Sequence, residues 1–315
     1  MVGLIMRSTG SWYEVLLENE NRIIPCRIVG KLKLEKDNIT NPVAVGDNVE
    51  LELEHEEQGV INSVLPRINF IARQSPKSRM QIHLIACNID QAMLITSMRE
   101  PDLKAGFIDR FLLTTEPQNI PVLIVFNKWD IYTEKDKLEY EELKKIYEHI
   151  GHEVLPASST KSIGIEILKD KLHHKTTLIS GQSGVGKSSL INQLSPGLDL
   201  KTSKLSGYSG KGIHTTTFAE MFRLDFDGFI IDTPGLKSLS FNNLSVMDVA
   251  HNFREFFLVS DKCRFGSKCT HRNEPDCEVK TQVENGTISE VRYKNYLNVV
   301  QEIEGMNYWE RNKKY

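Results

Sequence analysis

The segment 181–188 reads Gly-Gln-Ser-Gly-Val-Gly-Lys-Ser, which fits the pattern G-x-x-x-x-G-K-[ST] of a phosphate-binding loop. A β-type run precedes it at 177–180, and the residues after it can continue as a helix to 194. The glycines let backbone N–H groups turn toward phosphate oxygens, and the helix N-terminus adds partial positive charge. With these flanks, a chance glycine-rich turn is the weaker interpretation. We expect a nucleoside triphosphate to be bound through Gly181, Gln182, Ser183, Gly184, Val185, Gly186, Lys187, Ser188 and Ser189.

A second motif, Asn127-Lys128-Trp129-Asp130, ends the apolar run 122–126 and predicts guanine recognition. The carboxylate of Asp130 can accept hydrogen bonds from N1–H and the 2-amino group of guanine. Adenine lacks both donors and would leave a buried carboxylate unpaired, at a cost on the order of a few kcal/mol. We expect Lys128 to pack over the base and Asn127 to tie this loop to the phosphate-binding loop. Ser158, which follows another strand, is a weaker candidate for a guanine contact.

Two further motifs predict how magnesium and the γ-phosphate are held. The sequence Asp232-Thr-Pro-Gly235 follows an apolar strand and places Asp232 near the ion and the N–H group of Gly235 near the γ-phosphate. Three consecutive threonines follow His214, and one of them is the expected second magnesium ligand in a mobile loop. We favour Thr216. The predicted magnesium ligands are therefore Ser188, Thr216 and Asp232.

The order of these motifs differs from that of ordinary GTPases, in which the guanine reader comes after the phosphate-binding loop. Here the guanine reader at 127 and the serine loop at 158 precede it. The chain therefore reads as a circular permutation, which is tolerated where the termini of a domain lie close together. In this order the motif at 232–235 leads directly into the C-terminal segment, which can receive any movement that follows loss of the γ-phosphate.

The C-terminal segment contains three closely spaced cysteines and one histidine: Cys263, Cys269, His271 and Cys277. Three thiolates and an imidazole at short spacing are typical of a tetrahedral structural zinc site. Buried free cysteines beside a surface histidine are the alternative, and the clustering argues against it. Cys26 and Cys87 lie in apolar runs and are expected in the core.

Composition excludes some classes of protein. The chain has 315 residues, a net charge of −3 and 26% charged residues, as in an ordinary soluble protein, so any RNA contact must come from local basic patches. We find no signal-peptide pattern near the N-terminus and no run long enough to span a bilayer. Five cysteines make no disulfide framework in a chain of this size, which favours the cytoplasm.

The pattern of apolar residues divides the chain into three expected domains. Residues 1–70 carry β-type runs at 12–17, 23–29, 49–54, 60–61 and 64–65, and an OB-fold is only slightly favoured over other small β-folds. A basic, proline-interrupted linker is expected at 66–81, as a solvated connector or as a phosphate-contacting strip. Strands and helices alternate over 82–242, which predicts a mainly parallel sheet. Residues 243–315 are predicted to be mainly helical, with Val246, Ala250, Phe253 and Phe257 on one face.

Taken together, these motifs resemble the RsgA/YjeQ family of circularly permuted GTPases, and the resemblance covers essentially the whole chain. It implies an N-terminal OB-fold, a central permuted GTPase domain and a helical domain that binds one zinc ion. It also implies a cytoplasmic bacterial protein, expected to be a monomer, that binds GTP or GDP with magnesium. Such a protein binds the immature small ribosomal subunit and its rRNA near the decoding region, and the subunit stimulates its hydrolysis of GTP.

Two positions depart from patterns of the family or of other GTPases. Ile213 stands where the family usually has arginine before the histidine, which puts a phosphate or RNA contact there in doubt. Leu236 follows Gly235, where many GTPases place a glutamine that orients water; an apolar residue there matches the family. His214 is then the candidate to orient water, and Lys187 and magnesium would neutralise developing charge. The alternative function is a guanine-nucleotide-gated RNA-binding or signalling module with negligible turnover.

Overall fold

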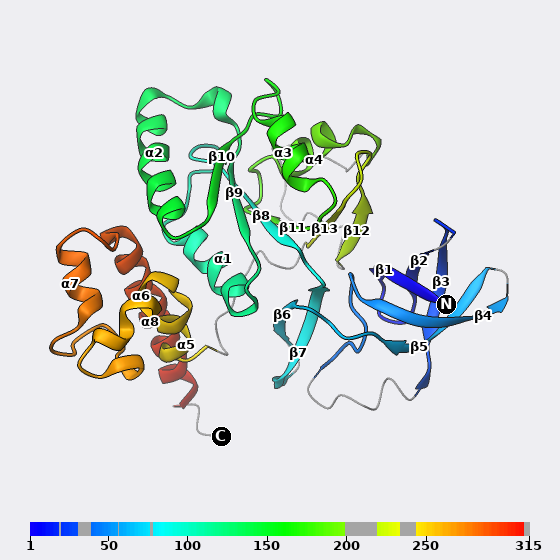
Figure 1. Cartoon of the computed structure of the whole chain (residues 1–315), viewed down its shortest axis with the longest axis horizontal. Coiled ribbons are helices and arrows are strands. Elements are labelled where there is room, and N and C mark those ends of the chain that lie inside the picture. The colour runs from blue at the N-terminus through cyan, green and yellow to red at the C-terminus, as the bar shows by residue number, and fades with distance from the viewer. Residues whose placement is uncertain are drawn as a thin grey trace.

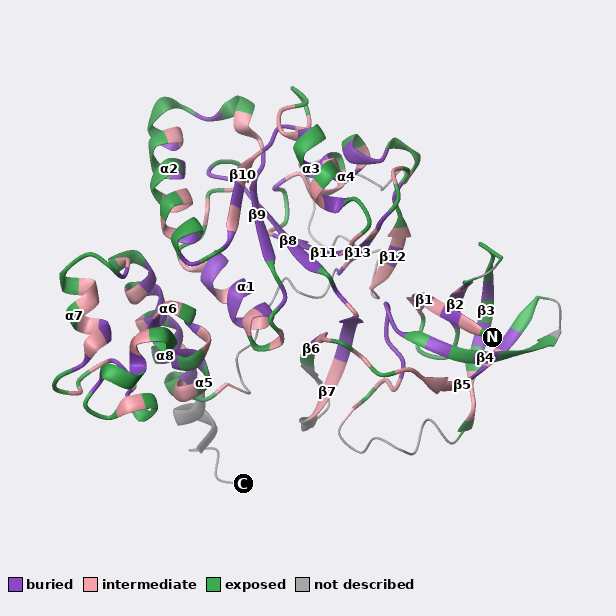
Figure 2. Ribbon diagram, viewed as in Figure 1, coloured by how far each residue is buried: buried purple, intermediate pink, exposed green. Residues whose placement is uncertain are grey.

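The computed structural model describes residues 1–18, 20–30, 39–55, 57–75, 78–198, 219–233 and 244–311. A β-barrel forms one end of the molecule, a sheet with helices around it forms the middle, and a helical part lies at the other end (Figure 1). Figure 2 shows that the central strands are the most completely buried elements. No helix in the described part of the chain is long and apolar enough to cross a membrane.

Five strands form the barrel: β1 (Val2–Ser8), β2 (Tyr13–Leu17), β3 (Ile23–Ile28), β4 (Asn48–His55) and β5 (Gln58–Val64). They pair in the order β1-β2-β3-β5-β4, and β4 pairs back with β1, so the ring is closed. Only β3 and β5 run parallel within this ring. The closed five-stranded ring confirms the OB-fold. The sequence prediction missed β1 and divided β5 into two strands.

A hairpin of β6 (Phe70–Ser75) and β7 (Ser78–Cys87) occupies most of the segment predicted to be a linker. Ile71 pairs with Ala86 in this hairpin, and both are buried. The segment is therefore ordered in strands because its apolar residues contribute to a core, although its prolines and basic residues are typical of a connector.

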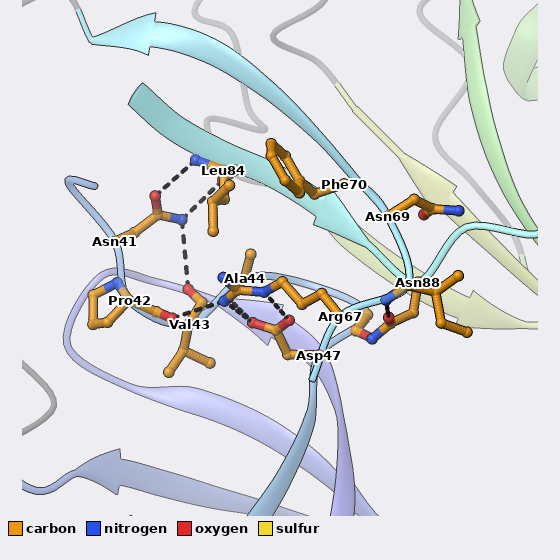
Figure 3. A network of polar contacts seen from close by, with 12 residues as sticks. Asn41, Pro42, Val43, Ala44, Asp47, Arg67, Asn69, Phe70, Leu84 and Asn88 are labelled. Carbon is orange, nitrogen blue, oxygen red and sulfur yellow. Dashed lines mark hydrogen bonds and ion pairs between the residues drawn. The ribbon is translucent and has the colours of Figure 1, made fainter. Parts of the chain in front are cut away.

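Buried polar contacts fix the barrel to this hairpin (Figure 3). The guanidinium of Arg67 donates two hydrogen bonds of 2.7 Å to the two carboxylate oxygens of Asp47, which is fully buried. Asp47 also accepts the N–H of Ala44 at 2.8 Å. The side chain of Asn41 both donates to and accepts from the backbone of Leu84, each at 2.8 Å. These contacts satisfy the buried groups at the junction and hold the two units in register.

The central sheet has the order β10-β9-β8-β11-β13-β12 and continues into the barrel where β12 pairs with β1. Its strands are β8 (Gln91–Thr96), β9 (Val122–Phe126), β10 (Glu153–Pro156), β11 (Thr176–Gly181), β12 (Glu220–Arg223) and β13 (Phe229–Asp232). All pairs among the first five strands in that order are parallel, and β12 is antiparallel to β13. This arrangement confirms the predicted mainly parallel sheet.

The helices around this sheet are α1 (Phe107–Thr115), α2 (Glu134–His149), α3 (Ile165–Leu172) and α4 (Lys187–Leu194). α3 was not predicted from the sequence. Its buried residues Ile165, Leu168 and Leu172 pack in one core cluster with apolar residues of α4. Parallel strands with helical connections bring the loops after β8, β9, β10 and β11 to one edge of the sheet.

The C-terminal part consists of α5 (Val246–Asn252), α6 (Arg254–Val259), α7 (Glu278–Glu284) and α8 (Glu290–Arg311). The predicted capping box of Ser245 and Asp248 is present at the start of α5. The helical phase breaks at Phe253, whose ψ is 94°. As a result Phe256 is fully buried, whereas Phe257 is 50% exposed, so the predicted place of Phe257 on the apolar face is wrong.

A buried charge network joins the C-terminal part to α1. Asp109 on α1 accepts hydrogen bonds from Arg292 at 2.7 Å, from the hydroxyl of Tyr147 at 2.9 Å and from Asn295. Arg292 also donates two hydrogen bonds, of 2.7 and 2.8 Å, to Glu255. The side chains of Asp109 and Arg292 are 0% and 3% exposed. Removing one member would leave an uncompensated charge away from water.

Candidate functional site

The phosphate-binding loop follows β11 and ends in α4, the strand–loop–helix arrangement that the motif requires. Glycine is needed at two of its positions, because Gly181 has φ 152° and Gly186 has φ 88°. A Cβ at Gly181 would lie 2.0 Å from the carbonyl oxygen of Ile95, and one at Gly186 would lie 2.6 Å from Nδ2 of Asn127. Any other residue at these positions would displace the neighbouring strand ends.

Lys187 is the first residue of α4, and its ammonium group lies over the phosphate-binding loop. Its Nζ donates to the carbonyl oxygens of Gly181 and Gln182, both at 2.8 Å. Ser188 follows Lys187 in the first turn of the helix. The positive charge, the helix N-terminus and the loop N–H groups therefore gather at one point, as binding of a polyphosphate requires.

The predicted guanine-reading loop at 127–130 lies against the phosphate-binding loop. Nδ2 of Asn127 donates to the carbonyl oxygen of Val185 at 2.8 Å, which confirms the predicted tie between the two loops. Lys128 has φ 64°, and its Nζ donates to the carbonyl oxygen of Glu100. The ring of Trp129 packs edge-on against Tyr140, with centroids 4.9 Å apart. The indole therefore packs the loop against α2.

Asp130 and Ser158 come from different strand ends and are in direct contact. The hydroxyl of Ser158 donates to Oδ1 of Asp130. This hydrogen bond is the main reason that the pKa of Asp130 is lowered. The backbone N–H of Trp129 donates to the carbonyl oxygen of Ala157 at 3.0 Å, which ties the same two loops together. The carboxylate is therefore ionised, and Ser158 fixes one of its two oxygens.

Asp232 is the last residue of β13 and pairs with Ile179 on the neighbouring strand β11. The hydroxyl of Thr233 donates to the carbonyl oxygen of Ile179 at 3.2 Å. This register brings the strand end that carries Asp232 to the edge where the phosphate-binding loop begins. Three further residues predicted near magnesium and the γ-phosphate, His214, Thr216 and Gly235, lie outside the described residues.

A second candidate site lies in the C-terminal part, where the ligand atoms of Cys263, Cys269, His271 and Cys277 all lie within 4.8 Å of one another. A tetrahedral centre with bonds of about 2.3 Å to sulfur and about 2.0 Å to nitrogen has S···S edges of about 3.8 Å and S···N edges of about 3.5 Å. The observed S···S distances are 3.8 and 4.0 Å, and those from Nδ1 of His271 to two of the sulfurs are 3.5 and 3.7 Å. The four residues therefore fit a metal ion.

The surroundings of this cluster orient its ligands. Tyr293 donates a hydrogen bond of 2.8 Å to the carbonyl oxygen of His271, and Tyr296 donates one of 2.6 Å to that of Thr270. All four ligands are buried, and burial raises the pKa of the Cys269 thiol to about 12. Buried thiolates need a cation for compensation, which a bound metal supplies.

The chain is similar over nearly its whole length to known proteins. The family model of the RsgA N-terminal domain matches residues 2–61. The family model of the RsgA GTPase matches residues 64–242, which is more than half of the chain. The chain belongs to the RsgA GTPase family. The curated "Small ribosomal subunit biogenesis GTPase RsgA 2" of Bacteroides thetaiotaomicron is 44% identical over 309 residues, which cover 98% of this chain and 99% of that protein. A Bacteroides fragilis relative named "Small ribosomal subunit biogenesis GTPase RsgA" is 43% identical, with the same coverage.

Two solved structures place this member of the family within a known architecture. The structure of YjeQ from Thermotoga maritima matches with a TM-score of 0.80 and 34% identity, over 96% of this chain and 98% of that one. The structure of YloQ, described as a circularly permuted GTPase, matches with a TM-score of 0.74 and 28% identity, over 100% of this chain and 96% of that one. The predicted circular permutation is thereby confirmed.

Sequence reasoning missed a group of residues that support the nucleotide site of this family member. The loop after β8 carries Arg99 and Glu100 and contacts both the guanine-reading loop and α2. Tyr132 and Asp136, which follow the N-K-x-D motif, accept hydrogen bonds from Met98 and Arg99 of this loop. No motif marks these residues, because each acts through a contact with a distant strand end.

Proposed function

We propose that this protein hydrolyses GTP to GDP and phosphate and acts in late maturation of the small ribosomal subunit in the cytoplasm. The observation that carries the proposal is the meeting of three motif loops and the strand end of Asp232 at one sheet edge, with Asp130 oriented by Ser158 beside the phosphate-binding loop. Relatives that match 98% of the chain carry the name of small ribosomal subunit biogenesis GTPase. We also propose rRNA as the contact on the subunit, a monomeric state, and functional domains at 1–70, 82–242 and 243–315.

The nucleotide would be bound from both ends. Asp130 reads the base, with Asn127, Lys128, Trp129 and Ser158 forming its surroundings, and residues 181–189 hold the phosphates. Guanine is selected over adenine because only guanine offers two donors to the Asp130 carboxylate. Lys187, whose Nζ already lies over the loop, reaches the β- and γ-phosphates.

Hydrolysis requires an oriented water and neutralisation of the charge that develops on the phosphates. Magnesium, held by Ser188, Thr216 and Asp232, would supply part of that neutralisation. Lys187 supplies the rest, the N–H of Gly235 contacts the γ-phosphate, and His214 orients the water. This assignment predicts slow hydrolysis by the free protein and faster hydrolysis once the subunit positions His214.

We propose that the cluster in the C-terminal part holds one zinc ion per chain. Three thiolates and one imidazole at tetrahedral spacing form a donor set that zinc prefers. Four protein ligands leave no open position, so the role is structural. The ion would hold together the loops between α6 and α7.

The test is GTP turnover with and without purified small ribosomal subunits, with ATP as the competing substrate. The proposal predicts hydrolysis of GTP in preference to ATP and a strong stimulation by subunits. Guanine-nucleotide binding with no turnover in either condition would overturn the enzymatic proposal and leave a nucleotide-gated RNA-binding module.

A further inference from the structure

We propose that Tyr132 is a specificity-determining positioning residue, whose hydroxyl fixes the guanine-reading loop 127–130 and so sets how well guanine is distinguished from hypoxanthine. Tyr132 follows the motif by two residues and is 7% exposed. The inference rests on the proposed function, because it assumes that Asp130 reads the base.

The hydroxyl of Tyr132 bridges two strand ends. It accepts the backbone N–H of Met98 at 2.7 Å, on the loop after β8. It donates to the backbone carbonyl oxygen of Asn127 at 2.9 Å, on the loop after β9. Burial raises the pKa of Tyr132, so the hydroxyl keeps the proton that it donates. One buried group therefore sets the spacing between these two loops.

The loop after β9 is bonded to the phosphate-binding loop, and the loop after β8 lies beside both. Asn127 donates its side-chain amide to Val185 at 2.8 Å. The loop after β8 accepts the ammonium group of Lys128 through Glu100, and Pro101 lies 3.6 Å from where a Cβ on Gly184 would stand. A shift of either loop would therefore change the position of the base reader relative to the phosphates.

Loss of this spacing should affect guanine more than hypoxanthine. The two bases differ by the 2-amino group, which is the second donor available to Asp130. Oδ1 of Asp130 is already held by Ser158, so the orientation of the carboxylate depends on where its loop lies. A displaced carboxylate loses the two-point contact first, and a base that makes a single contact has less to lose.

The chain offers a matched control in Tyr140. Its ring packs against Trp129 at 4.9 Å and against Phe126 at 5.2 Å, within the same aromatic cluster as Tyr132. Its hydroxyl is buried and has no hydrogen-bond partner among the described residues. Replacing either tyrosine by phenylalanine removes one buried hydroxyl, but only at Tyr132 does that hydroxyl connect the loops.

The experiment measures the Kd values of GTP and inosine triphosphate by competition for wild type, Tyr132→Phe and Tyr140→Phe. For Tyr132→Phe we expect the Kd of GTP to rise about tenfold, as for loss of the one hydrogen bond from the 2-amino group, and that of inosine triphosphate to rise much less. The preference for GTP over inosine triphosphate then falls. For Tyr140→Phe both Kd values should stay within about twofold of wild type.

A second variant guards against failure of Tyr132→Phe to fold. Arg99→Met removes the 2.5 Å contact from Nε of Arg99 to Asp136, which holds the loop after β8 to the start of α2. The Arg99 side chain is 46% exposed, so the substitution should not prevent folding. It should lower the same preference by a smaller factor. The inference is overturned if the Kd values of both nucleotides rise equally. It is also overturned if no variant that folds changes the preference for GTP over inosine triphosphate. A wild type that fails to prefer GTP over ATP would instead overturn the proposed function.

Discussion

The loops of the nucleotide site contact one another, whereas the ligands of the metal cluster converge on a shared centre. The guanine-reading loop is bonded to the phosphate-binding loop at 2.8 Å and to the loop after β10 at 3.0 Å. In the cluster, by contrast, the neighbouring ligand atoms are 3.5–4.0 Å apart, which is the spacing of donors around a metal. The first site is held by hydrogen bonds within the protein, and the second has the spacing that suits a metal ion.

This difference predicts how each site responds to damage. A site made of cross-bonded loops keeps its shape when ligand is removed, because its polar groups have partners in the protein. A site whose buried thiols have only weak partners loses its main source of local stability with the metal. Damage to one site should therefore leave the other intact. The exception is the charge network of Asp109 and Arg292, which joins the two domains.

Loss of the metal should give the largest effect. We expect Cys269→Ser to reduce the metal content from about one per chain and to remove on the order of 10 kcal/mol of apparent binding free energy. Metal analysis by mass spectrometry and hydrogen exchange should show an unprotected C-terminal part, while the Kd of GTP stays near wild type. Cys26→Ser, a buried cysteine of the barrel, is the control and should retain the metal. Full protection of 244–311 without metal would contradict the proposed structural role.

The next effect sharpens the comparison at the junction. Arg292→Met leaves the buried Asp109 and the partly buried Glu255 without a cation and should lower the free energy of unfolding of the C-terminal part by about 3–5 kcal/mol. Arg254→Met is the matched control, because Arg254 is 45% exposed and contacts Glu116 at 3.3 Å. Its loss should cost about 1 kcal/mol or less in the same denaturant titration. Equal costs for the two variants would show that the network does not hold the domains together.

A change of nucleotide preference tests the guanine-reading loop alone. Asp130→Asn should weaken GTP by about 3 kcal/mol, roughly 150-fold, and favour xanthosine triphosphate, because an amide can donate where the carboxylate accepted. Metal content should not change. In the wild type the lowered pKa of Asp130 keeps the carboxylate charged, so the GTP preference should be constant from about pH 5 to 8 and decline only at lower pH. An unchanged preference for GTP in the variant would refute the assignment.

The smallest effect concerns His214, which lies outside the described residues. We expect His214→Ala to lower the subunit-stimulated rate about a hundredfold while GTP affinity and basal turnover stay near wild type. A residue that only binds nucleotide would raise the Kd instead. Subunit binding by the variant is measured in parallel, and a loss of binding that matches the loss of rate would make His214 a docking residue.

Local patterns were sufficient for the elements whose chemistry is local. The phosphate-binding loop, the N-K-x-D motif and the capping box at Ser245 each require certain residues at short spacing, so each could be predicted. β1 could not be, because its burial alternation is interrupted by a register shift between Ile5 and Arg7. The predicted helical face at Phe257 failed because the break at Phe253 changes the phase of the helix.

Contacts between distant residues had no pattern that could predict them. Asp109 and Arg292 are 183 positions apart, and neither lies in a motif. Tyr132 and Met98 are 34 positions apart, and their contact depends on the adjacency of β8 and β9 in the sheet. Such residues become visible only when the strand order is known, which is why the motif residues of the nucleotide site were predicted and the residues that support them were not.

The proposed function couples the guanine-nucleotide site to the small ribosomal subunit, and we expect the bound nucleotide to set the affinity for the subunit. The most direct measurement is co-sedimentation of the full chain with purified small subunits in the presence of a non-hydrolysable GTP analogue or of GDP. We expect the protein to pellet with the subunits in the presence of the analogue and to remain in the supernatant with GDP. Equal pelleting with both nucleotides, or no pelleting with either, would contradict this expectation.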